Sequence, residues 1–230
     1  MKLLNNRSSR VKIRSLASFQ DLRGETGRAA ESGGTIHIAL GNGGLIGEDA
    51  VTSLAALEIV EELADTAILY NAPPIITVGD PTLLPLAQDI LRRAHERHGL
   101  VKRYNPDQVR FIAPSPVAYA AGAASVVMTE NVMSNAMIGA FGSEVSLLVD
   151  AGARRDLPQL AAAAAPEAIG ALYPATDRLA VGEELFAAGS QMVEKRRYTI
   201  SLQAQDFLRL ILAGLVGIIA LLTFAASFVQ

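Results

Sequence analysis

The run Gly41–Gly47, which reads GNGGLIG, is the segment whose residue types come nearest to a recognisable binding chemistry. It follows a short β-branched stretch and precedes a helical pattern. In that context a glycine-rich turn brings backbone N–H groups close to a phosphate. A tight strand-to-helix turn that needs positive φ explains the same glycines without any ligand. The predicted ligand-binding residues are Gly41, Asn42, Gly43, Gly44 and Gly47.

The remaining parts of a dinucleotide fingerprint do not accompany this run. Its G-x-G-x-x-x-G spacing is one residue longer than the usual form, and an acidic residue is expected about 20 residues further on. Asp80 lies beyond that distance and precedes Pro81, so it is expected to cap a helix. The chain also contains no G-x-x-x-x-G-K-[ST] loop. The glycine pattern therefore predicts an anion or nucleotide site only as one of two alternatives.

Three carboxylates, Glu144, Glu183 and Glu184, are the candidates for a catalytic role. Glu144 follows a predicted strand, whereas Glu183 and Glu184 begin a predicted helix. Ligands bind at the carboxyl ends of strands in doubly wound sheets, where two acids can hold a cation or act as general acid and base. Glutamate at a helix start also complements the helix dipole without further function. The sequence leaves catalysis uncertain, with the balance against an enzyme.

The histidines do not predict a metal site. His95 and His98 have the spacing of metal ligands, but a catalytic zinc site needs a third protein ligand. The chain has only one other histidine, His37, and no cysteine. The pair is expected to be solvated at the negative end of its helix. His37 alternates with Ile36 and Ile38, which favours a partly buried, hydrogen-bonded imidazole over a general base. No cofactor can be named.

The elements that would position these residues follow one repeated pattern, in which a short apolar run is followed by a turn and then by a longer helical segment. Strands are predicted at 35–40, 75–79, 109–113 and 136–141, with a fifth, short strand within 157–164. Helices are predicted at 49–70, 81–98, 114–129, 143–153 and 181–193. Strands apolar on both faces that alternate with helices predict a mostly parallel sheet with helices on both faces. Right-handed crossovers make this an open, doubly wound, Rossmann-like α/β domain.

The strongest physical signal lies near the C-terminus, where Leu210–Val229 runs for twenty residues without a charge. A helix of that length spans about 30 Å, the thickness of a bilayer's hydrocarbon core. Few helices of soluble proteins are apolar on every face. One C-terminal transmembrane helix is therefore predicted, in contact with the lipid bilayer through Leu210–Val229.

The charges that flank this span predict its orientation. Lys195, Arg196, Arg197 and Arg209 precede it, whereas only Gln230 follows it. The positive-inside rule then places the bulk of the chain in the cytoplasm of a single-pass cell-membrane protein. The first residues contain no apolar run that would make a secretory signal. The predicted division is a basic flexible arm over 1–34, a cytoplasmic α/β domain over 35–205 and the transmembrane helix over 207–229.

Charge and small residues limit the choice of partners. A net charge of −3 argues against nucleic acid as an obligatory partner. Residues 1–30 hold seven Lys or Arg against two acids, so this arm can lie on anionic headgroups. Ala213 and Gly217 form a small-x-x-x-small pair that can seat a second membrane helix, and Ala118–Ser125 is also rich in small residues. The small residues of 118–125 let their helix lie close to the sheet or to another subunit. Contact with another chain at either place would make a homo-oligomer or a complex with a membrane-protein partner.

Several segments together resemble an uncharacterised family of bacterial, Chloroflexi-type, membrane-anchored proteins that is a domain of unknown function. The segments are IHIALGNGGLIGEDAVTSLAALEIVEELA, DPTLLPLAQDILRRA, VRFIAPSPVAYAAGAAS, NAMIGAFGSEVSLLVDAGAR, VGEELFAAGSQM and SLQAQDFLRLI. The resemblance implies a globular domain joined directly to a membrane helix, and it brings no catalytic residue or substrate. This chain departs from the family pattern at Ala161–Ala165 and at Asp177–Arg178, so a ligand contact of relatives at either place is in question here.

Three hypotheses follow from the sequence. The first is a non-catalytic, membrane-anchored module that binds a small ligand or a partner protein, because a strong anchor is combined with no complete catalytic set. The second is an enzyme or sensor for a nucleotide or phosphate ligand, with its site at the strand carboxyl ends. The third is a structural subunit of a membrane complex.

Overall fold

The computed structural model describes residue 31 and residues 33–186. The described residues belong to one compact unit, which covers residues 15–193. The predicted transmembrane helix, and the predicted arm except for its last residues, lie outside the described residues. Among the described residues, no helix is both long enough and apolar enough to cross a membrane.

Six parallel strands form one sheet in the order β3-β2-β1-β4-β5-β6. Every neighbouring pair is parallel, which confirms the predicted α/β class. The chain moves outward from β1 to β3, returns across β1 to β4, and then moves outward to β6. The strands are β1 (Thr35–Gly41), β2 (Ile75–Val78), β3 (Val109–Phe111), β4 (Val132–Ala140), β5 (Gln159–Ala163) and β6 (Arg178–Val181).

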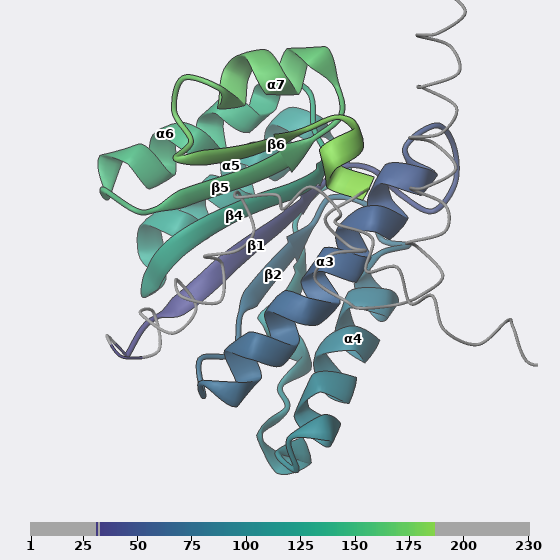
Figure 1. The fold of residues 1–230 in the computed structure, drawn as a ribbon, viewed down its shortest axis with the longest axis vertical. Helices are drawn as coiled ribbons and strands as arrows, with labels where there is room; N and C mark the ends of the chain where they lie inside the picture. The colour runs from purple at the N-terminus through teal and green to yellow at the C-terminus, as the bar shows by residue number, and fades with distance from the viewer. Residues whose placement is uncertain (1–30, 32, 187–230) are drawn as a thin grey trace, which may run out of the picture. The chain divides into compact units, whose positions relative to one another are not determined.

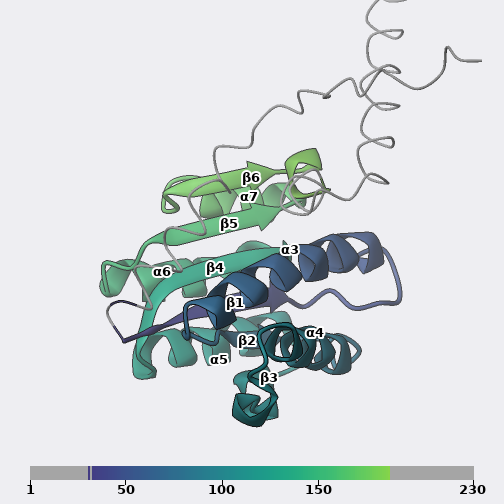
Figure 2. The same ribbon diagram turned by 60° about the horizontal axis from the view of Figure 1, so that its bottom comes forward.

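Helices cover both faces of this sheet (Figures 1 and 2). Helices α3 and α4 lie on one face, and α5, α6 and α7 lie on the other. The helices are α3 (Ala50–Leu69), α4 (Leu84–Arg97), α5 (Pro116–Thr129), α6 (Ser146–Arg154) and α7 (Pro166–Leu172). Single 3-10 turns occur at η1 (Val101–Arg103), η2 (Pro106–Gln108) and η3 (Ser143–Val145).

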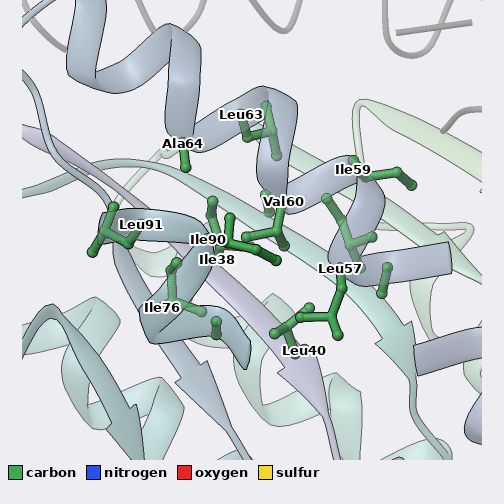
Figure 3. Close-up of a cluster of buried hydrophobic side chains, with 14 of the residues drawn as sticks. Ile38, Leu40, Leu57, Ile59, Val60, Leu63, Ala64, Ile76, Ile90 and Leu91 are labelled. Atoms are coloured by element: carbon green, nitrogen blue, oxygen red, sulfur yellow. The ribbon is translucent and has the colours of Figure 1, made fainter. Parts of the chain in front are cut away.

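Each face of the sheet has its own apolar core because successive strand residues point to opposite sides. Ile36, Ile38 and Leu40 of β1 belong to the cluster under α3 and α4. Figure 3 shows part of this cluster, in which Leu57, Val60 and Leu63 of α3 face the strands. Ala39 points the other way and packs in the cluster under α5, α6 and α7. A parallel sheet covered on both sides needs such two-sided apolar strands.

The structure corrects several predicted boundaries. Helix α4 begins at Leu84, not at Pro81, and its start has no side-chain cap. Strand β4 begins four residues earlier than predicted, at Val132. The short fifth strand is confirmed, but helix α7 and strand β6 were not predicted from the sequence. Strand β6 has only four residues, which is too short to show a strand pattern.

Helix α3 offers a matched pair of leucines that tests this packing. Leu63→Ala removes a side chain that is 1 % exposed, and we expect it to lower the free energy of unfolding by about 2–5 kcal/mol. Leu54→Ala makes the same change on the same helix at a position 51 % exposed, and we expect a change within about 0.5 kcal/mol. Urea denaturation of the full chain in detergent measures both values. Equal losses at the two positions would contradict the placement of α3.

Candidate functional site

The glycine-rich loop, residues 41–47, lies where the strand order reverses. Strand β1 has β2 on one side and β4 on the other, and the chain crosses over from β3 to β4. The Asn42 N–H donates to the Ala140 carbonyl at 3.0 Å, and the Gly41 carbonyl accepts from the Gly79 N–H at 2.8 Å. The loop is therefore joined to the ends of both neighbouring strands. Open α/β sheets bind ligands at reversal points of this kind.

The fold itself requires glycine at several loop positions. Gly41 and Gly47 have φ values of 76° and 98°, which side chains rarely adopt. A Cβ on Gly43 would lie 2.6 Å from the Ser53 hydroxyl oxygen, and one on Gly44 would lie 2.6 Å from the Asp80 carboxylate. The explanation by a tight turn therefore accounts for these glycines, and a ligand is not needed to explain them.

Asp80 lies closer to the glycine-rich loop than its position in the sequence predicts. It stands two residues beyond the end of β2, at the carboxyl edge of the sheet and against Gly44. The interval from the glycines is long only because α3 has 20 residues. Asp80 Oδ1 accepts hydrogen bonds from the Thr82 N–H at 2.8 Å and from the Thr82 hydroxyl. Among the described residues, Asp80 Oδ2 has no hydrogen-bond partner.

Several polar groups around the same loop have no partner among the described residues. The side-chain oxygens of Asn42 and Ser53 are buried and have no partner in the described part of the chain. Ser53 lies in the first turn of α3 and is completely buried. The N–H groups of the buried residues Gly43 and Gly44 also lack a partner among the described residues. An unpaired buried polar group costs about 1–3 kcal/mol, so a cluster of them is a feature that a bound ligand would explain.

The three candidate glutamates do not gather with the loop into one site. All three lie at the carboxyl edge, but Glu144 follows β4, next to β1, whereas Glu183 and Glu184 follow β6. Three strand spacings, roughly 14 Å, separate β6 from β1. Glu144 Oε1 accepts from the Gly142 N–H at 2.8 Å, and Glu184 Oε2 accepts from the Val181 N–H at 3.3 Å. Each of these two carboxylates therefore stabilises its own turn.

The loops at this edge carry acids and no bases. The six loops are residues 42–49, 79–83, 112–115, 141–145, 164–165 and 182–184, and none of them contains Lys, Arg or His. Their acids are Glu48, Asp49, Asp80, Glu144, Glu183 and Glu184. The described residues contain no group of three or more His, Asp or Glu side chains that could hold a metal ion. A ligand here would meet backbone N–H groups in a negative field.

His37 lies in the core below the loop and is buried completely, not partly as expected. Its Nδ1 is 2.8 Å from Asn135 Oδ1, and its Nε2 is 3.0 Å from the Thr77 hydroxyl oxygen. Burial lowers the pKa of His37 to about 4, although the hydrogen bond with Asn135 acts in the opposite direction. His37 is therefore neutral at pH 7 and has no access to a ligand, which agrees with the prediction that it is not a general base.

The other two histidines differ from each other. His95 is 1 % exposed, so the expectation that it is solvated is wrong. Its Nδ1 donates to the Leu91 carbonyl at 2.8 Å, and its ring meets the edge of Tyr104. His98 is the helix's C-cap residue, as expected, and lies 3.2 Å from an Asp65 carboxylate oxygen.

A family model matches residues 2–230, nearly the whole chain. The chain belongs to the DUF6754 family. This family is described as a domain of unknown function. The match confirms the predicted resemblance to an uncharacterised family. The bacterial source and membrane anchoring of the DUF6754 chain stay predictions. Comparisons with curated proteins and with solved structures give no match.

The buried imidazole predicts how the stability of the DUF6754 chain depends on pH. The pKa of His37 is about 4 in the folded chain and 6.5 as its ordinary value, so between these values only the unfolded chain binds the proton. Stability is therefore complete above about pH 6.5 and falls as the pH drops toward 4, by about 3 kcal/mol in total. Urea denaturation at pH 7 and pH 4.5 measures the loss of stability on acidification for the natural chain and for His37→Asn. The carboxylates titrate in both proteins, so the difference between the two losses is the contribution of His37. Equal losses on acidification in the two proteins would show that His37 is not buried in its neutral form.

Proposed function

We propose that this chain is a membrane-anchored ligand-binding domain that takes a nucleotide at the carboxyl ends of β1, β2 and β4. The observation that carries the proposal is the group of polar atoms at the reversal point of the sheet that have no partner in the described part of the chain. The N–H groups of Gly43 and Gly44 can donate to a phosphate, and Asp80 Oδ2 can accept from a ribose hydroxyl. A nucleotide supplies both partners in one molecule.

Two features support binding without catalysis. Glu144 and Glu184 each accept a backbone N–H of their own turn, and Glu183 and Glu184 follow a strand distant from the loop. His37, the one histidine near the loop among the described residues, is sealed in the core. A general acid or base must reach the reacting group within hydrogen-bond distance, and Glu183, Glu184 and His37 are not placed for that. Glu144 lies nearer, but its carboxylate accepts the Gly142 N–H.

The acidic edge sets which nucleotides should bind best. The loop and the neighbouring edge loops after β2 and β4 contain Glu48, Asp49, Asp80 and Glu144 and no Lys, Arg or His, so each added negative charge on the ligand is repelled. The N–H groups of the loop and the start of α3 offset part of this repulsion. We therefore expect AMP and NAD⁺ to bind more tightly than ATP. Mg²⁺ neutralises part of the charge of ATP, so we expect it to reduce this difference in affinity.

Thermal unfolding of the full chain in detergent, with each of these nucleotides at millimolar concentration, tests the binding proposal. Saturation at 100 times Kd raises stability by about 2.7 kcal/mol, which is a measurable increase in Tm. Asp80→Asn keeps the shape of the side chain but, with its oxygen still on Thr82, replaces the acceptor Oδ2 by an NH₂ donor, and we expect it to reduce the shift although one repelling charge is lost. Asp107→Asn, an exposed acid in η2 ahead of β3, is the matched control and should keep the shift. No Tm change with any nucleotide would refute the proposal.

The membrane part of the proposal rests on Leu210–Val229, which lies outside the described residues. Twenty uncharged residues match the hydrocarbon thickness, and four basic residues precede them. A position at the membrane would place the binding domain close to membrane-bound partners, which suits a sensor or an adaptor better than a freely diffusing enzyme.

Substitution of Leu215 and Ile219 by Arg tests this anchor. Each arginine at the centre of a span costs about 2.5–3.5 kcal/mol of insertion free energy, so we expect the double variant to leave the membrane fraction. Resistance of the natural chain to extraction by alkaline carbonate is the measurement. Leu57→Ala, inside the described domain, serves as a control and should stay with the membrane. Extraction of the natural chain itself would contradict the anchor.

A further inference from the structure

We propose that Tyr119 is a positioning residue for the glycine-rich loop, at the end of a hydrogen-bond chain that crosses the core from Gln159 to Gly41. The chain consists of Gln159, Asn135, His37, Thr77, Tyr119 and Gly41, in that order. Its effect on the loop stands on the structure alone, and only its effect on ligand affinity rests on the proposed function.

The far end of the chain has a fixed direction. Gln159 Nε2 faces the Val149 carbonyl at 3.0 Å and the Ala175 carbonyl at 3.3 Å, and carbonyl oxygens only accept. The side-chain oxygen of Gln159 therefore accepts from Asn135 Nδ2 at 3.2 Å. This leaves Asn135 Oδ1 to accept from His37 Nδ1, which must carry the hydrogen. The imidazole is thus held as one tautomer.

The direction continues to the loop. Because Nδ1 of the neutral imidazole carries the hydrogen, Nε2 accepts from the Thr77 hydroxyl at 3.0 Å. Tyr119 Oη lies 3.2 Å from both the hydroxyl and the carbonyl oxygen of Thr77, and it donates to one of them. The same Oη accepts from the Gly41 N–H at 3.1 Å. The roles from Gln159 to the Thr77 hydroxyl are therefore each set by the previous group, and Tyr119 joins Thr77 to the Gly41 N–H through one of the two Thr77 oxygens.

Tyr119 connects the first residue of the loop to helix α5. The Asn42 N–H donates to the Ala140 carbonyl, and the Leu45 N–H donates to the Thr82 hydroxyl at 3.0 Å, so these contacts come from the ends of β4 and β2. Asn42 Nδ2 donates to the Pro114 carbonyl at 3.2 Å, in the turn before α5. Tyr119 reaches Gly41 from the first turn of α5, on the opposite face of the sheet from α3. It is fully buried, and burial raises its pKa to about 12, so its hydroxyl keeps its hydrogen.

Tyr119→Phe removes one oxygen atom and tests this role. The measurement is amide hydrogen exchange of the full chain in detergent, read on peptides covering residues 41–49. A hydrogen bond contributes about 0.5–1.5 kcal/mol, so we expect exchange in the loop to become about 2- to 12-fold faster, with the α4 peptides unchanged. Tyr104→Phe is the matched control, because the Tyr104 hydroxyl donates to the Gln88 carbonyl at 3.2 Å on α4, far along the chain from the loop. It should leave loop exchange unchanged.

A second variant keeps the proposal testable if Tyr119→Phe does not fold. Thr77→Val removes the hydroxyl that lies between His37 and Tyr119, and we expect it to accelerate loop exchange in the same peptides. Uniform acceleration over the whole domain, or loop exchange equal to that of Tyr104→Phe, would overturn the proposal. If AMP binds the natural chain, we expect Tyr119→Phe to raise the Kd for AMP by the same factor by which it accelerates exchange in the loop. Faster loop exchange without any AMP binding would support the positioning role and refute the proposed function.

Discussion

A neutral imidazole in the middle of an apolar sheet is the constraint on which the rest of this structure depends. His37 sits on the central strand and is wholly buried, where a charged ring would have no compensating carboxylate in contact. Burial of a polar group is tolerated only when its hydrogen bonds are made. The sheet meets this requirement with polar side chains on both neighbouring strands, Asn135 on β4 and Thr77 on β2. The centre of the sheet is therefore specified by hydrogen bonding as well as by apolar packing.

The same constraint reaches the proposed site. The chain of hydrogen bonds that satisfies His37 ends on the Gly41 N–H, at the first residue of the glycine-rich loop. Beyond Gly41 the pattern changes, because the N–H groups of Gly43 and Gly44 and the Ser53 hydroxyl have no partner among the described residues. A hydrogen-bonded chain of side chains through the core therefore leads to a loop whose polar groups have no such partners. This contrast is what a binding site held by a rigid core would present.

Much of the fold was predictable from the sequence, because apolar runs and helical spacing are local signals. Strand β6 was missed because four residues are too few to show a strand pattern, and α7 was missed because it follows directly on the alanine run that ends at Ala165. The glycine-rich loop was found by its residue types. Asp80 was misjudged because its distance from the loop along the chain depends on the length of α3, whereas its distance in space depends on sheet order.

The role of Tyr119 could not be predicted in this way. It lies in an alanine-rich helix with no polar pattern around it, and its partners Gly41 and Thr77 are 78 and 42 residues away in the chain. Only the strand order brings those residues together. Pairings between residues far apart in sequence carry no local signature, so the polar core required a structure whereas the apolar core did not.

The most direct test of the account is the tautomer of His37. Nitrogen-15 spectra of the side chains at pH 6 distinguish a protonated from a bare ring nitrogen, and comparison with His37→Asn assigns the signal among the chain's three histidines. The account predicts a neutral ring with its hydrogen on Nδ1 and a bare Nε2. A ring protonated on Nε2, or on both nitrogens, would contradict the direction of the hydrogen-bond chain and with it the link from the core to the glycine-rich loop.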